Sequence, residues 1–212
     1  MARTRAHDYD AKRAAVLHHA AALFAQHGYT GTSITMIARA CGVSKALLYH
    51  YYSDKEAVLF DILSAHLEHL LAEARAAAAA AEPQARLFAL TDALLNAYRD
   101  ADAEHQVQIA NLKLLPPPLQ EKLRAMEREL VDLFADAIAG AVPEVGRGPL
   151  LKPIAMSLFG MLNWHYLWFR EGKGLTRSEY ALLVTGIIER GAGPTAAALA
   201  AARAATDGPP RP

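Results

Sequence analysis

The 212-residue chain contains one cysteine, Cys41, which excludes an internal disulfide framework and is typical of proteins from a reducing compartment. Its longest uncharged apolar run covers residues 153–169 and contains Asn163 and His165. This run falls short of the roughly 20 residues that a membrane-spanning helix needs. The N-terminus is polar and has no apolar signal-peptide core. The sequence therefore predicts a soluble, cytoplasmic protein.

Strand signals are nearly absent, because the chain has neither alternating β-branched runs nor Asn-Gly hairpin turns. Its alanine and leucine content favours an all-α fold. A GxSxG nucleophile turn, an HExxH motif and a phosphate-binding glycine loop are also missing, which argues against an enzyme. His66, His69 and Glu73 have the spacing of a shared helix face, but a solvated face is the favoured interpretation. No metal or cofactor is expected.

Net charge is absent overall, with 22 Lys and Arg against 22 Asp and Glu, but the distribution along the chain is uneven. Residues 1–55 hold seven cations and three anions, so the remainder is net negative. A polyanion responds to such a local basic surface and not to the whole-chain charge. The seven cations are Arg3, Arg5, Lys12, Arg13, Arg39, Lys45 and Lys55.

The stretch TSITMIARACGVSKALLYHYY, residues 32–52, predicts two short helices joined by a tight turn. Ser33 and Ser44 stand where each helix needs an N-terminal cap, and Gly42 stands where the first must end. A helix, a glycine-containing turn and a second helix form a helix-turn-helix, whose second helix can enter the major groove of DNA. Its expected outward side chains Ser44, Lys45, Tyr49 and His50 are hydrogen-bond donors, which suits a groove lined by phosphates.

The segment GVSKALLYHYYSDKEAVL resembles the end of the DNA-binding domain of TetR-type transcriptional regulators, and AALFAQHGYTGTSITMIARACGV resembles that family's first two helices. The resemblance covers about residues 10–60. It implies that the motif and its surroundings bind DNA. The alternative for Tyr51, as for Tyr52, is packing against the following helix. The predicted DNA-binding residues are Thr32, Ser33, Thr35, Arg39, Ser44, Lys45, Ala46, Tyr49, His50, Tyr51 and Lys55.

Two residues depart from the family pattern, which often has glycine and a small polar residue after the lysine. This chain has Ala46 and Leu47 there. An exposed Leu47 would touch a thymine methyl group instead of donating a hydrogen bond, which leaves the base preference open.

About nine helices are expected, arranged as an N-terminal helix-turn-helix domain and a C-terminal helical bundle. The predicted boundaries are 1–55 for the DNA-binding domain, 56–206 for an effector-binding and dimerisation domain and 207–212 for a disordered tail. Residues 1–8 are expected to form a disordered basic arm, either lying along DNA or simply solvated. The expected helices cover residues 10–27, 33–41, 44–52, 54–81, 83–98, 103–115, 119–141, 150–171 and 176–190.

A single helix-turn-helix buries too little surface for tight, selective binding, so a homodimer on a palindromic operator is expected. The resemblance implies that the last two helices of each subunit form a four-helix interface. The alternative is that their apolar stripes belong to the core of one chain. The predicted interface residues are Ile154, Leu158, Met161, Trp168 and Ile187.

The family resemblance also implies a small hydrophobic effector that releases DNA, with repression as the usual mode. The segment NWHYLWFREGKGLT resembles regulators of fatty-acid, steroid or aromatic-acid catabolism that respond to acyl-CoA thioesters. Arg170 and Lys173 would meet the phosphates, or would only offset the negative end of their helix. The alternatives are a drug-efflux regulator and an architectural DNA-binding protein without an effector. The predicted effector residues are Tyr98, His105, Phe134, Asn163, Trp164 and His165.

Overall fold

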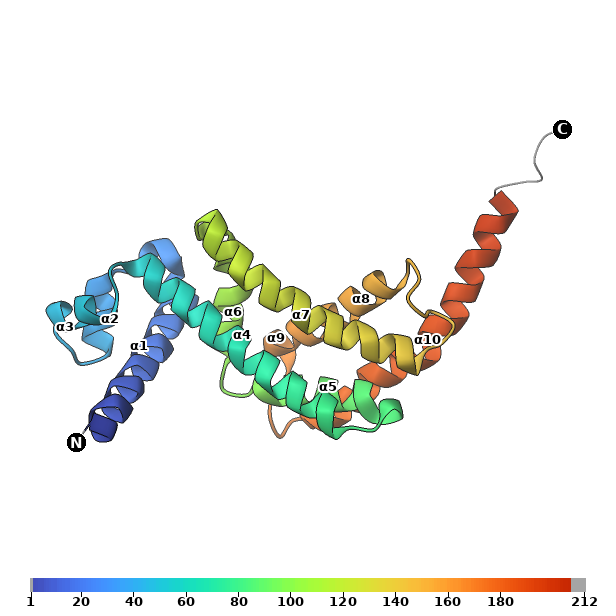
Figure 1. Cartoon of the computed structure of the whole chain (residues 1–212), viewed down its shortest axis with the longest axis horizontal. Coiled ribbons are helices and arrows are strands. Elements are labelled where there is room, and N and C mark those ends of the chain that lie inside the picture. Colours follow the sequence, from blue (N-terminus) through green and yellow to red (C-terminus); the bar gives the residue numbers. More distant parts are fainter. Residues whose placement is uncertain (1, 207–212) are drawn as a thin grey trace. The chain divides into compact units, whose positions relative to one another are not determined.

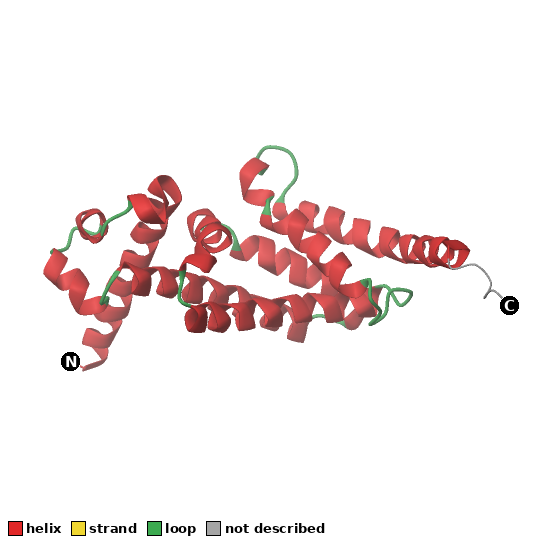
Figure 2. Cartoon of the chain, turned by 90° about the horizontal axis from the view of Figure 1, so that it is seen from above, coloured by secondary structure: helices red, strands yellow, loops and turns green. Residues whose placement is uncertain are grey.

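The computed structural model of the chain describes residues 2–206, with side chains described for residues 12–203, 205 and 206. Helices joined by loops make up this part of the chain, and no strand occurs among these residues (Figure 2). The predicted all-α class is confirmed, whereas the predicted tail at 207–212 lies outside the described residues. The α-helices are α1 (Ala2–Gly31), α2 (Ile34–Ala40), α3 (Lys45–Tyr51), α4 (Lys55–Ala80), α5 (Arg86–Ala97), α6 (Asp102–Asn111), α7 (Pro117–Ala141), α8 (Leu151–Asn163), α9 (His165–Trp168) and α10 (Arg177–Thr206), and the short 3-10 helices are η1 (Pro83–Ala85) and η2 (Leu112–Leu114).

The chain divides into two compact units. Unit 1 comprises residues 1–69 and 100–127, and unit 2 comprises residues 70–99 and 128–212. Helices α4 and α7 therefore contribute residues to both units. The boundary between the DNA-binding domain and the effector-binding domain, placed between residues 55 and 56, stays a prediction.

Unit 1 is built around an apolar core that joins the first three helices to the start of α4 and to α6 (Figure 1). Phe24 of α1, Ile37 of α2 and Leu48 of α3 are almost fully buried in it, together with Leu63 of α4 and Val107 of α6. Burial of a side chain of this size stabilises the fold by roughly 1.5–3 kcal/mol. The short helices α2 and α3 thus owe their place to few inward residues, Ile37 and Ala38 in α2 and Leu48 in α3, and to their caps.

Unit 2 is organised around α10, which packs against α5 and α8. Leu90 and Leu94 of α5, Leu158 of α8 and Val184 of α10 are buried in it, as is Phe134 of α7. The start of α10 is fixed by a capping box, because the Thr176 N–H and hydroxyl both donate to Glu179 and the Glu179 N–H donates back to the Thr176 hydroxyl. The hydrogen bond from the Thr176 N–H lowers the pKa of the Glu179 carboxyl. The sequence predicted this pattern, and it is confirmed.

Three helix boundaries differ from expectation. Residues 2–8, expected as a disordered arm, form the first turns of α1. The single apolar helix expected at 150–171 ends at Asn163, and after Trp164 the chain forms the separate short helix α9. The last helix continues through Pro194 to Thr206, past the end expected at about residue 190 and into the alanine-rich tail, for which the sequence left a helical extension open because alanine has the highest helix propensity.

Candidate functional site

The helix-turn-helix of unit 1 has the geometry that its two serines and its glycine predict. The Ser33 Oγ accepts a hydrogen bond from the Met36 N–H at 3.2 Å and caps α2, and the Ser44 Oγ accepts one from the Leu47 N–H at 3.1 Å and caps α3. Gly42 has a positive φ of 65°, which glycine adopts without the strain other residues incur. Both caps and the turn are therefore confirmed.

Helix α3 has one buried side and one exposed side. Leu48 is buried and Tyr51 is partly buried, while Lys45, Ala46, Leu47, Tyr49 and His50 are exposed. The Lys45 Nζ lies 5.7 Å from the centre of the Tyr49 ring, so the two side chains share one flank of the helix. We call α3 the recognition helix from here on, because its exposed side combines a cation with hydrogen-bonding groups.

Eight of the eleven predicted DNA-binding residues are exposed, and two, Tyr51 and Lys55, are half-buried. The exception is Thr32. Its side chain is 1% exposed, and its hydroxyl donates to the carbonyls of Leu23 and Gly28 at 3.1 and 2.9 Å. A DNA contact from the Thr32 side chain is therefore contradicted, because the hydroxyl ties the end of α1 to the start of α2.

Lys55, the first residue of α4, points into unit 1. Its Nζ donates to the Tyr29 carbonyl at 2.7 Å and to the Thr32 carbonyl at 2.8 Å, and lies 4.2 Å from the centre of the Tyr29 ring. We call these three contacts the Lys55 clamp. An ammonium has three donors, so the predicted phosphate contact stays a prediction for the remaining N–H alone.

The recognition helix is also held at its C-terminal end. Tyr52 is buried, and its hydroxyl donates to the Asp61 carboxylate of α4 at 2.6 Å. The Arg13 guanidinium of α1 pairs with the other oxygen of that carboxylate. Burial and the Asp61 carboxylate raise the pKa of the Tyr52 hydroxyl, which stays protonated at any physiological pH. Tyr52 thus packs against α4, the alternative that the sequence left open for it.

We call the contacts of Tyr52 and Arg13 with Asp61 the C-terminal lock of the recognition helix. An open hollow of about 420 Å³ lies beside it in unit 1. Its lining includes the carboxylates of Asp54, Glu56 and Asp61 and a single cation, Arg13, which is paired with Asp61. An excess of negative charge repels phosphates, so the charges of this hollow do not suit a nucleic acid.

A buried histidine pair joins α4 to α6 in unit 1. The rings of His66 and His105 lie 5.7 Å apart, and both residues are almost fully buried. Burial, with help from the nearby His105 and His69, lowers the pKa of His66 to about 3. Sequence spacing grouped His66 with His69 and Glu73 instead, because no local signal indicates a partner 39 residues along the chain. His105 is the one predicted effector residue that belongs to unit 1.

Four of the predicted effector residues in unit 2 are buried or half-buried. The Tyr98 hydroxyl donates to the Asn163 side-chain oxygen at 3.0 Å, and Phe134 stacks against Phe159 with ring centres 4.9 Å apart. His165 is surrounded by rings, those of Phe169 at 4.3 Å and Tyr180 at 5.8 Å among them. The structure thus brings Tyr98 and Asn163 together. The fifth residue, Trp164, is exposed on the surface of unit 2.

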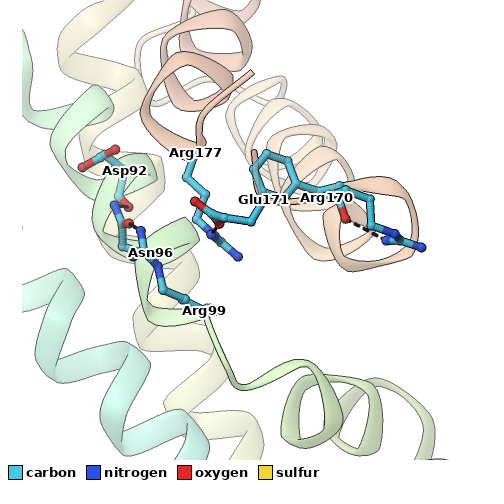
Figure 3. A network of polar contacts seen from close by, with 7 residues as sticks. Asp92, Asn96, Arg99, Arg170, Glu171 and Arg177 are labelled. Atoms are coloured by element: carbon cyan, nitrogen blue, oxygen red, sulfur yellow. Dashed lines mark hydrogen bonds and ion pairs between the residues drawn. The ribbon is translucent and has the colours of Figure 1, made fainter. Parts of the chain in front are cut away.

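A polar network lines the loop between α9 and α10 (Figure 3). The Arg177 side chain is only 11% exposed, pairs with the Glu171 carboxylate and lies 4.9 Å from the Phe169 ring centre. Arg170 donates to the Phe169 carbonyl, the capping position of α9, at 2.7 Å. Arg170 therefore binds the carbonyl of the residue that caps the end of α9. This is the second of the two alternatives that the sequence left open for Arg170.

The predicted interface residues differ in how far their side chains are exposed. Trp168 and Ile187 are about half exposed, whereas Leu158 is fully buried in its own chain, which contradicts a contact with a second subunit. Ile154 and Met161 are half-buried. Apart from Trp168 and Ile187, the interface prediction did not select the exposed apolar residues of this region, because helical periodicity favours the inward stripe of a helix. Between residues 151 and 190 the exposed large apolar residues are Met156, Trp164, Leu167, Trp168, Leu175, Leu182, Leu183 and Ile187, which we call the unit 2 apolar surface.

Two searches of the described residues bear on other functions. No group of three or more His, Cys, Asp or Glu side chains among residues 12–203 is placed to hold a metal ion. Within residues 2–206, every helix is either too short or too polar to cross a bilayer.

An outward-facing recognition helix on a capped helix-turn-helix defines a DNA-binding protein of the helix-turn-helix class. Comparison with known families agrees. Residues 16–62 match the model of bacterial regulatory proteins of the tetR family, and residues 80–192 match the tetracyclin repressor-like C-terminal domain. The chain belongs to the TetR family of transcriptional regulators, which confirms the resemblance seen in the sequence.

Individual relatives share this architecture. A TetR-family transcriptional regulator from Bordetella parapertussis 12822 is 34% identical, with a TM-score of 0.78 over 83% of this chain and 93% of that one. AibR, solved in complex with isovaleryl coenzyme A and operator DNA, is 27% identical, with a TM-score of 0.72 over 84% of this chain and 98% of that one. The transcriptional regulator RutR from Escherichia coli K12 is 29% identical over 165 residues, 78% of each chain.

Proposed function

We propose that the chain represses transcription by binding a palindromic operator as a homodimer, and that a small hydrophobic effector, with acyl-CoA thioesters as the leading class, releases it. The exposed side of the recognition helix is the observation that supports operator binding most directly. Lys45, Tyr49 and His50 lie there beside the exposed Ser33, Thr35 and Arg39 of the neighbouring turn and α2. Together they offer charge and donors to phosphates and base edges.

Operator binding is tested with duplexes selected from a random library by the full-length protein. Lys45→Ala and Tyr49→Phe are expected to weaken binding of the selected duplex about tenfold and severalfold, because each removes one contact of roughly 1 kcal/mol. Lys113→Ala, which removes an exposed cation elsewhere in unit 1, is the matched control. If both recognition-helix variants bind like the parent protein, the assignment of α3 is wrong.

The unit 2 apolar surface supports the homodimer. Soluble monomers rarely expose a contiguous patch of large apolar side chains. Leu183 and Ile187 lie one turn apart on α10, which packs against α8, the helix that carries Met156. A second copy of the same surface would cover these residues, as an isologous interface requires. Light scattering during size-exclusion chromatography tests this directly, and a monomer at micromolar concentration would contradict it.

The acyl-CoA hypothesis is supported by similarity to AibR and by the apolar interior of unit 2, which offers the hydrogen-bonded pair Tyr98 and Asn163. Calorimetry with isovaleryl-CoA, longer acyl-CoAs, the free acids and lipophilic cationic drugs tests it, and operator release is followed in parallel. Heat and release with acyl-CoAs are expected. Heat with the drugs alone would favour an efflux regulator, and operator binding without any response would favour an architectural protein.

A further inference from the structure

The outward direction of the recognition helix follows from its one buried residue. Residues of an α-helix are about 100° apart around its axis, so the positions most nearly opposite the buried Leu48 are Ala46 and His50. Tyr49 and Leu47 flank them on opposite sides. Lys45 lies on the Tyr49 flank, and on the opposite flank Leu47 is an apolar side chain next to Tyr51 and His50.

Leu47 is 38% exposed and is not among the residues that pack against the core of unit 1. Its side chain has no polar atom, and its backbone N–H is already bonded to the Ser44 hydroxyl. All that the Leu47 side chain itself offers a partner is apolar surface. Covering such apolar surface with a partner removes it from water and lowers the free energy.

The major groove offers one apolar group, the C5-methyl of thymine, whereas the other base edges present donors and acceptors. We propose that Leu47 reads a pyrimidine C5-methyl group, so that each operator half-site holds a thymine beneath the Leu47 flank of the recognition helix. The polar flank of Lys45 and Tyr49 then faces the phosphates or neighbouring base edges. This inference rests on the proposed DNA-binding function and names the base that one side chain selects.

Deoxyuridine tests the inference, because it differs from thymidine by this methyl group alone. Each thymine of a duplex selected by the full-length protein is replaced in turn, at the symmetric positions of both half-sites. One position is expected at which the replacement weakens binding about fourfold per half-site. Leu47→Ala is expected to bind the thymine and uracil forms of that position equally. Leu114→Ala, which shortens another exposed leucine of unit 1, is expected to keep the fourfold preference.

Three results would overturn the inference. They are a selected operator without such a thymine, a duplex in which no replacement matters, and a methyl preference that persists in Leu47→Ala. In each of these the proposed function survives, because the protein still binds a defined duplex. If the full-length protein selects no DNA at all, the proposed function fails and the inference fails with it. Leu47 is exposed, so a thermal unfolding curve like that of the parent is expected for the alanine variant.

Discussion

The exposed faces of the two units differ in kind. On unit 1, the recognition helix presents a cation and hydrogen-bonding groups, and the inward-pointing polar side chains of Thr32, Lys55 and Tyr52 hold the short helices in place. On unit 2, α8 and α9 begin without a side-chain cap, and their region exposes eight large apolar residues. A polyanion requires rigidly placed donors, whereas a protein partner supplies apolar cover. The contrast supports the proposal that unit 1 binds DNA and that unit 2 binds a second subunit.

The largest expected effect comes from a charge placed on the unit 2 apolar surface. Ile187→Glu would bury a carboxylate without a partner in the dimer, at a cost of several kcal/mol. We expect a monomer in light scattering and an operator affinity reduced about 100-fold or more, because one helix-turn-helix then binds alone. Ile109→Glu, at an exposed isoleucine of unit 1, serves as the control and should remain dimeric. A dimeric Ile187→Glu protein would contradict the proposal that the unit 2 apolar surface binds a second subunit.

The Lys55 clamp gives the next largest effect. Lys55→Met removes two hydrogen bonds from a charged donor, although the Tyr29 carbonyl keeps the bond from the Thr32 N–H, so the free energy of unfolding should fall by about 2–4 kcal/mol. Urea denaturation measures this. Lys45→Met, at the exposed lysine of the recognition helix, should change stability by less than about 0.5 kcal/mol. Equal losses of unfolding free energy in the two variants would contradict a stabilising role that Lys55 has and Lys45 lacks.

Acid should destabilise the protein through the buried histidine pair. The pKa of His66 is lowered to about 3 in the folded chain, below its ordinary value of 6.5, so the unfolded chain binds the proton more readily. The contribution of neutral His66 is fully present above pH 6.5 and is lost as pH falls toward 3. Between pH 7 and pH 5 we expect a loss of about 2 kcal/mol.

His66→Gln separates this effect from the titration of other groups. Removing the titrating ring should flatten the dependence of the unfolding free energy on pH in that window, as measured by urea denaturation at several pH values. His50→Gln, at an exposed histidine of the recognition helix, should leave the slope unchanged. A slope unaffected by His66→Gln would mean that the pair does not govern acid stability.

The smallest effect is expected at the C-terminal lock of the recognition helix. Tyr52→Phe deletes the hydroxyl that donates to Asp61 and should lower the unfolding free energy by about 1 kcal/mol. Tyr49→Phe removes an exposed hydroxyl and should leave stability unchanged while weakening DNA binding. This pair sharpens the comparison at the end of the recognition helix, since Tyr52 is expected to affect stability and Tyr49 is expected to affect DNA binding.

Local signals made the helix-turn-helix predictable. Ser33, Ser44 and Gly42 act on backbone groups within four residues, so the sequence alone indicates the caps and the turn. Contacts across the chain left no such trace. Nothing near Thr32 or Lys55 indicates that both point inward, because their partners lie on the preceding helix and loop.

Unit 2 was predicted in its helices but less well in its surfaces. The apolar spacing that includes Leu158 identifies α8, yet it selects the side that packs within the chain, while Met156 of the same helix is exposed. The end of α8 before Trp164 was not predicted either. Between residues 154 and 169 the sequence has no charged residue, no proline and only one glycine, so no strong signal ends a helix there.

The Lys55 clamp has a consequence for chemical modification. An amine reacts with an acylating reagent only through a free, deprotonated nitrogen, and the Lys55 nitrogen is held by two carbonyls and an aromatic ring. Lys45 stands in solvent on the recognition helix. Acetylation should therefore reach Lys45 first and remove a positive charge from the DNA-facing side while leaving the internal bonds of unit 1 intact, so that one covalent mark changes operator affinity without unfolding the protein.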